Sequence, residues 1–429
     1  MHTKSRLIPI LGAVALALVA ACGTSSTGGG TTSGGGGLAG CTGSVTVASD
    51  LPTSGGDAAI GGGTENGVRA AVLKAQQEKL LGGCTINYIP KNDASVAKGE
   101  HDPALGAQNM IALTTNPAVV GVVGPFNSSV AIAEMPIANR AGMLLLSPAN
   151  TNPGLTIAGS RPDVDTNSLR PTGKVTYYRI IWNDIAQGAD DAQISYKELN
   201  ARKAYIIDDQ EAYGKGLADF FEKYFKQDGG TVLKHVALPG TTKDFKAQLT
   251  EAKGLGADLL FFGGVAANGS GIIYCQMKDV GLTAKYMSGD GTVDPQFFKD
   301  CAGTNGDGAY ATSAPDATKT SAGAGFTPLY DASFADSSRV VYSPYGYDAM
   351  RIVLNAVKAV LVDNGGKVPT DSASFRSKVI AKVAATKYDG FVGHIEFDQN
   401  GDTTNHAFGL YSSKGGQWTQ SEVVQAPPV

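Results

Sequence analysis

The sequence predicts an α/β protein with two doubly wound lobes, each built on a parallel sheet. Short runs rich in β-branched and aromatic residues alternate with stretches of helical periodicity, which is the pattern of parallel sheets covered by helices on both faces. The runs are apolar almost throughout, as strands buried on both sides should be. The chain beyond Cys41 is also longer than one hydrophobic core usually supports, which favours two lobes.

The N-terminal end has the form of a secretory signal. A basic start, MHTKSR, precedes the uninterrupted apolar stretch LIPILGAVALALVAA, which is too short for a comfortable membrane span. Small residues then precede Cys22 in VAACG, which resembles the lipobox of bacterial lipoproteins, where the chain is cut before the cysteine and lipid is attached to it. We expect a signal peptide over residues 1–21 and lipid on Cys22. The alternative is an ordinary signal peptide with an incidental cysteine.

A tether is expected next, over residues 22–42. The segment Gly23–Gly40 consists almost entirely of Gly, Ser and Thr, so it cannot bury enough apolar surface to fold and should behave as a coil. No later apolar run is long enough to cross a bilayer. We therefore expect a folded body from residue 43 onward, anchored to the outer face of the bacterial cell membrane through the lipid alone.

The expected strands follow one another between helical stretches. In chain order they are SVTVAS, TINYI, AVVGVVG, MLLLS, KAYIID, TVLKHVAL and DLLFFGG. Two helices are clearest: NGVRAAVLKAQQEKLLGG, with Gly82 placed to cap its end, and GKGLADFFEKYFKQDGG, which ends before Gly229. Near the C-terminus, GHIEFDQNGDTTNHAFGLYSS predicts an antiparallel hairpin that turns at Asn400–Gly401.

Four cysteines remain if Cys22 carries lipid, which is an even number in an oxidising compartment. Four cysteines allow three pairings. Cys41 lies just before the first expected strand and Cys84 opens the second, so neighbouring parallel strands would place them side by side. Cys275 and Cys301 bracket a single strand-and-loop unit. We therefore expect the bridges Cys41–Cys84 and Cys275–Cys301.

Two apolar strands end abruptly in small polar residues. GVVGPFNSS places Ser128 and Ser129 ahead of a helical stretch, and LLLSPANTNPGL places Ser147 to Thr151 directly after a run of leucines. Ligands of doubly wound sheets bind beyond the carboxyl ends of the strands, where helix N-termini favour an anion. The two loops together are suited to hold a carboxylate. Helix capping is the alternative role for Ser128.

The segment GPFNSSVAIAEMPIANRAGMLLLSPANTNPGLT resembles the signature of the periplasmic leucine/isoleucine/valine-binding proteins, the solute receptors of ABC importers. Further matches keep the family's order: YYRIIWNDIAQG, AYIIDDQEAYGKGLADFFEKYFKQDGG, KDFKAQLTEAKGLGADLLFFGG, YMSGDG, YGYDAM and FDQNGD. The resemblance spans Val45 to Leu410. It implies a periplasmic binding protein-like type I fold of two lobes joined by three crossings, with lobe one over 43–180 and 314–388 and lobe two over 181–313 and 389–429.

The resemblance also implies how a ligand is held. The family binds the α-carboxylate of an amino acid in the first lobe, at the positions of Ser128 and Thr151. The α-ammonium meets the carbonyl at the position of Ala149, while the residues matching Tyr213 and Asp290 reach in from the second lobe. An unpaired carboxylate in a cleft is costly, so Asp290 fits best if the ligand brings a cation. From the sequence without the resemblance, a turn residue is an equally good interpretation of Asp290, and a packing residue is an equally good interpretation of Tyr213.

This chain differs from the family in a region that shapes which ligand side chain is preferred. The family often has an aromatic residue after the strand matching LLFFGG, where this chain has Val265 in GGVAANGSG. The resemblance therefore does not fix which amino acid is bound. Trp182, in IIWND, is expected to supply the missing surface of the pocket, and packing at the crossing is the alternative.

The remaining signals favour a binding protein over an enzyme. The formal net charge is −4 and no basic face is interleaved with aromatic residues, so we expect no nucleic-acid partner. The histidines show no metal-ligand spacing, there is no HExxH, and Asn268 stands where a GxSxG elbow needs glycine. DQNGD lacks the closing glutamate of a calcium loop. We expect no catalytic residue, cofactor or metal, and a secreted hydrolase is the less favoured alternative.

The resemblance implies a monomeric, exported lipoprotein that captures a branched-chain or related amino acid between its lobes. It implies delivery of that ligand to the permease and ATPase of an ABC transporter. A ligand-sensing receptor of the same fold, for an amide or a small organic acid, is the alternative that the sequence leaves open.

Overall fold

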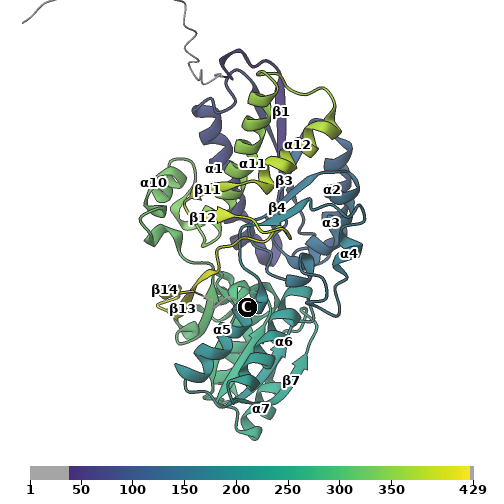
Figure 1. Ribbon diagram of the computed structural model, residues 1–429. Helices are drawn as coiled ribbons and strands as arrows, with labels where there is room; N and C mark the ends of the chain where they lie inside the picture. The colour runs from purple at the N-terminus through teal and green to yellow at the C-terminus, as the bar shows by residue number, and fades with distance from the viewer. Residues whose placement is uncertain (1–37, 426–429) are drawn as a thin grey trace, which may run out of the picture. The chain divides into compact units, whose positions relative to one another are not determined.

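The computed structural model describes residues 38–425 (Figure 1). Its first sheet has five parallel strands in the order β2-β1-β3-β4-β5. Four of these strands confirm the sequence prediction. The fifth escapes it, since three residues are too few to show a pattern. The bounds are β1 Ser44–Leu51, β2 Thr85–Asn92, β3 Val119–Val123, β4 Leu144–Ser147 and β5 Tyr177–Arg179.

The second sheet has seven strands in the order β14-β13-β10-β9-β8-β6-β7. Strands β6 to β10 run parallel to one another, whereas β13 and β14 form an antiparallel edge. The predicted α/β class with parallel sheets is confirmed. The bounds are β6 Lys203–Asp208, β7 Thr231–Ala237, β8 Leu259–Gly263, β9 Lys285–Ser288, β10 Tyr310–Ser313, β13 Ala407–Lys414 and β14 Gln417–Gln425.

Helices cover both faces of each sheet. Their bounds are α1 Ala58–Gln77, α2 Pro103–Thr115, α3 Ser128–Arg140, α4 Thr166–Leu169, α5 Asp184–Lys197, α6 Ala212–Gln227, α7 Lys246–Leu255, α8 Ser270–Asp279, α9 Gln296–Asp300, α10 Phe326–Asp331, α11 Ser343–Asp363 and α12 Ser372–Ala384. Successive strand residues face opposite sides, so in β1 Val47 packs with α1, α11 and α12 while Ala48 packs with α2 and α3. In β6, Ile207 packs with α7 and α8 while Ile206 packs with α5 and α6.

The chain passes between the two sheets three times. It leaves the first sheet after β5 and returns after β10 as α11, whose Met350 lies in the same core as Val47. A small sheet of β11 (Lys387–Gly390) and β12 (Gly393–Glu396) follows, and Ile395 of β12 still belongs to this first-sheet core. The third passage therefore lies between residues 396 and 407, later than the expected boundary at residue 389.

The hairpin expected around Asn400–Gly401 is reduced to a single antiparallel bridge, Phe397–Thr403, beside the turn. β12 pairs with β11 and β13 pairs with β14, so the strands on either side of the turn belong to different sheets. The turn itself exists, because the Asp398 carboxylate accepts the N–H groups of Asn400 at 2.8 Å and Asp402 at 2.9 Å. Alternation along a strand shows which face is buried, but it does not name the partner strand.

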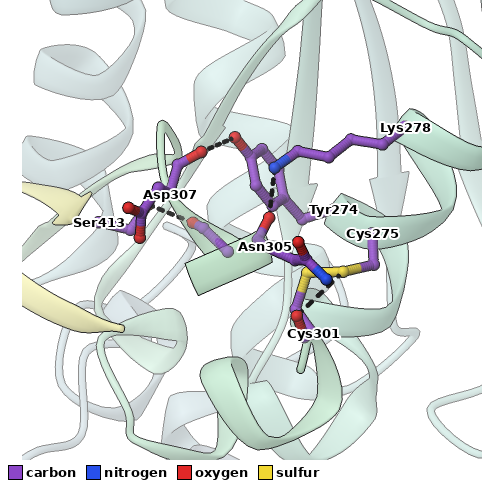
Figure 2. Close-up of a disulfide and its surroundings, with 8 residues drawn as sticks. Tyr274, Cys275, Lys278, Cys301, Asn305, Asp307 and Ser413 are labelled. Atoms are coloured by element: carbon purple, nitrogen blue, oxygen red, sulfur yellow. Dashed lines mark hydrogen bonds between the residues drawn. A yellow bond between two sulfur atoms is a disulfide. The ribbon is translucent and has the colours of Figure 1, made fainter. Parts of the chain in front are cut away.

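Both predicted disulfides are present, Cys41–Cys84 and Cys275–Cys301. The first joins the starts of β1 and β2, which pair in parallel as expected. Figure 2 shows the second, which ties α8 to the end of α9. From the same helix α8, Tyr274 donates its hydroxyl to the carbonyl of Asp307 at 2.7 Å. The loop after α9 is thus held to α8 by the disulfide and by hydrogen bonds from Tyr274 and from Lys278, which donates to the carbonyl of Asn305.

The signal peptide, Cys22 and most of the expected tether lie outside the described residues. The described chain begins at Leu38, which is buried in the first-sheet core, and Cys41 follows in its bridge. Residues 38–42, expected in the tether, therefore belong to the folded body. Gly82 is not the cap of α1, which ends at Gln77. Its φ is +63°, and a Cβ atom there would collide with the carbonyl of Leu38.

No helix between residues 38 and 425 has the length and apolarity needed to cross a bilayer.

Candidate functional site

The two polar loops at the carboxyl edge of the first sheet are bonded to each other. Ser147, at the end of β4, donates its hydroxyl to the carbonyl of Pro125 at 2.8 Å. The Asn150 side-chain amide donates to the carbonyl of Phe126 at 2.7 Å. The Ser147 oxygen also accepts the backbone N–H groups of Ala149 and Asn150. The small polar residues after the leucine strand therefore fix their loop against the segment that leads into α3.

Arg179 holds the same loop from the neighbouring strand β5. Its guanidinium donates to the backbone carbonyls of Asn150 at 3.3 Å and Asn152 at 2.8 Å. The side chain is fully buried and forms an ion pair with Asp402 at 2.7 Å. Since Thr151 lies between the two asparagines, Arg179 sets the position of one of the predicted ligand contacts.

Asp290 follows β9 and accepts a hydrogen bond from a tyrosine on either side. Tyr213, in the first turn of α6, donates to Oδ1 at 2.8 Å, and Tyr342, at the N-terminal end of α11, donates to Oδ2 at 2.7 Å. Asp290 is only 4% exposed. Tyr213 belongs to the second-sheet core and Tyr342 to the first-sheet core. The carboxylate of Asp290 therefore accepts one hydrogen bond from each core.

The loops of the two sheets line a common pocket. Its lining includes five of the six residues predicted to bind ligand, and all five are buried: Ser128, Ala149, Thr151, Tyr213 and Asp290. Phe126, Asn127, Val265 and Gly291 complete the lining. Five segments that are far apart in the sequence thus contribute residues to one pocket.

Trp182 is not among the residues that line this pocket. It belongs to the first-sheet core, and its ring packs edge-on against Phe408 with centroids 5.4 Å apart. The prediction that Trp182 supplies a surface of the pocket is therefore not supported, because apolar packing at the crossing buries the ring. Val265, where the family often has an aromatic residue, does line the pocket.

The second-sheet side of the pocket carries an acidic group. Asp290 is the one carboxylate in the lining, and none of the lining residues is Lys, Arg or His. Burial raises the pKa of Asp290, while the hydrogen bonds from Tyr342 and Tyr213 limit that rise. Behind the pocket, Asp184 donates its backbone N–H to the carbonyl of Thr151 at 2.8 Å, and burial raises the pKa of its carboxyl to about 7.

The first-sheet side offers hydrogen-bond donors. α3 begins at Ser128, and the side chain of Asn127 at its N-cap makes no capping bond to the first turn. The N-terminus of a helix carries uncapped N–H groups and a partial positive charge, which favour an anion. The pocket therefore combines an anion-binding helix end with a buried carboxylate, and this combination is complementary to a zwitterion.

Sequence reasoning missed two aromatic residues of the site, Phe126 and Tyr342. Both lie within or just beside segments that carry the resemblance, Phe126 in GPFNSS and Tyr342 three residues before YGYDAM. Their rings meet edge-on with centroids 5.1 Å apart. A tyrosine ahead of a helix gives no signal of a carboxylate partner 52 residues away, so only the fold reveals this contact.

Comparison with known proteins agrees with this architecture. A periplasmic binding protein family model matches residues 44–417. The Leu/Ile/Val-binding protein BraC3 of Rhizobium johnstonii is 29% identical over 382 residues, which cover 88% of this chain and 94% of that protein.

Solved structures share the fold. The branched-chain amino acid transporter substrate-binding protein LivJ of Streptococcus pneumoniae, in complex with isoleucine, superposes with a TM-score of 0.76 at 24% identity and covers 90% of this chain and 100% of that one. A solute-binding protein of an ABC transporter from R. palustris, in complex with 4-hydroxybenzoate, superposes with a TM-score of 0.74 at 21% identity. The match covers 90% of this chain and 98% of that one.

The predicted resemblance is confirmed by the family model and by the curated relatives that share it. Both solved structures support the fold alone, since their identities are low and their ligands differ. The family match covers most of the chain, and it includes the first sheet, the second sheet as far as the start of β14, and every residue of the pocket. The chain is a member of the periplasmic binding protein family.

Proposed function

We propose that the chain is the extracytoplasmic solute-binding component of an ABC importer, with an α-amino acid, branched-chain or related, as its ligand. The observation that supports this most strongly is Asp290, a buried carboxylate in a pocket without Lys, Arg or His, across from the start of α3. A zwitterion satisfies both ends of the pocket, whereas a simple acid leaves Asp290 without a cation. The names of the curated relatives point to the same ligand class.

In this proposal seven of the nine lining residues contact a particular part of the ligand. Ser128 and Thr151 hold the ligand carboxylate with the N–H groups of the first turn of α3. The carbonyl of Ala149, the hydroxyl of Tyr213 and the carboxylate of Asp290 hold the ammonium. Phe126 and Val265 are the apolar lining residues, so they are suited to contact the ligand's side chain. No covalent chemistry is required, which agrees with a binding protein rather than an enzyme.

Ligand capture would then be coupled to movement of two lobes. Lobe one comprises the first sheet and the helices that cover it, up to residue 180 and again from residue 314. Lobe two comprises the second sheet, with residues 181–313 and the C-terminal strands. A ligand held by residues of both lobes favours the closed arrangement through contacts that exist only there.

The proposal includes a lipid anchor on Cys22, which lies outside the described residues. The cysteine follows the apolar stretch of the signal and precedes the Gly/Ser/Thr tether. Cys22→Ser is expected to release the protein from the membrane into the medium or the soluble fraction. Fractionation followed by immunoblotting tests this, and retention of the variant in the membrane fraction would contradict a lipid anchor.

A ligand screen tests the proposed function. The purified folded body is mixed with α-amino acids, their amides, and aromatic acids including benzoate and 4-hydroxybenzoate, and its thermal unfolding is followed. A ligand that binds the folded state alone raises the unfolding temperature. We expect branched-chain or related α-amino acids to raise it and the aromatic acids to leave it unchanged. A shift with aromatic acids alone would contradict the amino acid proposal and favour an organic-acid receptor on the same fold.

A further inference from the structure

Three carboxyl groups meet inside the first-sheet region, away from the residues that line the pocket. Asp50 lies near the end of β1, Asp93 directly follows β2, and Glu134 lies in α3. All three side chains are completely buried, at 0% exposure. One carboxylate oxygen of each lies within 4.8 Å of the others. Three separate segments of the chain therefore bring acidic side chains close together in the protein interior.

The hydrogen bonding of these groups is incomplete within residues 38–425. Asp50 Oδ1 accepts from the side-chain amide of Asn109 at 3.0 Å. Asp50 and Glu134 lie within hydrogen-bond reach of each other and can share a carboxyl proton, whereas neither oxygen of the Asp93 carboxyl has a hydrogen-bond partner. Buried polar atoms in native proteins are rarely left unpartnered. Asp93 in particular is a fully buried, unpartnered side chain that points at the pair formed by Asp50 and Glu134.

No basic residue neutralises the cluster. Among the described residues, none of the three carboxylates forms an ion pair with Lys, Arg or His. The histidine closest in sequence, His101, is bonded to Asp57 at 2.8 Å, and its charge offsets only part of the rise in the pKa of Asp93. Burial and mutual repulsion raise the pKa values of Asp93 and Glu134 well above their usual range. Buried carboxylates without counter-charge must take up protons or bind a cation.

We propose that Asp50, Asp93 and Glu134 form a binding site for a hard divalent cation, with Ca²⁺ as the best match. Carboxylate oxygens are the ligands that such ions prefer. Oxygens bound at about 2.4 Å from one ion lie at most about 4.8 Å apart, and one oxygen from each of the three carboxyl groups meets this condition. The three groups offer up to six oxygens and exclude solvent, which suits Ca²⁺ better than Mg²⁺, because Mg²⁺ usually keeps several waters.

Helix α2 packs closely against the cluster. Gly106 of α2 faces the cluster, and a Cβ atom there would lie 3.0 Å from Glu134 Oε1. The cation would link β1 and the end of β2 to α3. Since α3 begins at Ser128 in the candidate pocket, the ion would also fix the helix that presents the anion-binding end. The site itself does not depend on which ligand that pocket takes.

The test uses the purified folded chain after chelator treatment and gel filtration. Thermal unfolding is recorded in CaCl₂, in MgCl₂ and in NaCl of equal ionic strength, and CaCl₂ is titrated into the protein by calorimetry. We expect one Ca²⁺ per chain, and a rise in unfolding temperature of about 2–5 °C at a hundredfold excess over Kd. Asp93→Asn and Glu134→Gln should each abolish this rise. Both variants should also be more stable than the chelated wild type, because a buried repulsive charge is removed.

Asp190→Asn is the matched control. Asp190 is also buried and has an unpartnered oxygen, but it lies on α5, away from the cluster. This variant should keep the full Ca²⁺ response. Absence of heat and of any Ca²⁺-dependent shift in the wild type would overturn the proposal and leave protons shared among the carboxyls. A response that persists in both Asp93→Asn and Glu134→Gln would overturn it as well.

Discussion

Replacing Asp290 by asparagine is expected to weaken binding of the amino acid ligand about thirty-fold or more, since losing one partner of a desolvated charge pair costs about 2–5 kcal/mol. The substitution keeps the size of the side chain and removes its charge. One of the two tyrosine hydroxyls that donate to Asp290 can still donate to the amide oxygen of the asparagine, and the other can rotate to accept from its NH2 group, so the pocket should keep its shape. What is lost is the counter-charge for the ammonium. Titration calorimetry with the amino acid found in the screen measures the effect.

Thr151→Val is the matched control for this experiment. It removes a neutral hydroxyl on the carboxylate side, while the backbone donors of α3 remain. A net hydrogen bond contributes about 0.5–1.5 kcal/mol, so its loss should be about tenfold or less. An unchanged unfolding temperature in both variants would confirm that the fold is intact. Wild-type affinity in Asp290→Asn would contradict the assigned role of this residue.

Arg179→Met is expected to lower the free energy of unfolding by about 3–5 kcal/mol, because it leaves a buried charge without its partner. Arg179 is fully buried and pairs with Asp402 at 2.7 Å. It also donates to Thr156 Oγ1 at 2.6 Å and to two carbonyls of the loop that carries Thr151. The variant should therefore lose stability and ligand affinity together. Chemical denaturation and calorimetry measure the two losses.

Arg351→Met serves as the control for Arg179. Its ion pair with Glu78 is partly exposed, with side chains 15% and 37% accessible. Exposed pairs of this kind contribute about 0–1 kcal/mol. If Arg179→Met were no more costly than Arg351→Met, the ion pair with Asp402 would not be what holds the polar loop in place.

Much of the fold could be predicted because local patterns determine it. Buried parallel strands such as LLFFG are apolar throughout, and a helix such as α6 shows its spacing of Leu217, Phe221 and Phe225. The pairing Cys41–Cys84 followed from the order of two neighbouring strands. In each case the physical cause lies within a short stretch of chain or between adjacent strands.

The failures concern contacts between distant segments. The strands around Asn400 alternate as a hairpin should, yet each pairs with another strand, because the turn serves to bring Asp402 to Arg179. Trp182 has the size to line a pocket, but Phe408 buries it in the core. Tyr342 could not be assigned to Asp290 without the fold. Such pairings depend on tertiary geometry, which no local pattern records.

The central claim is that the pocket recognises both charges of an amino acid. The most direct test compares, by calorimetry on the wild-type protein, the amino acid found in the screen with the same carboxylic acid lacking its amine. The account predicts that the deaminated acid binds about thirty-fold more weakly or worse, since Asp290 then has no cation. Equal affinity for the two compounds would contradict it.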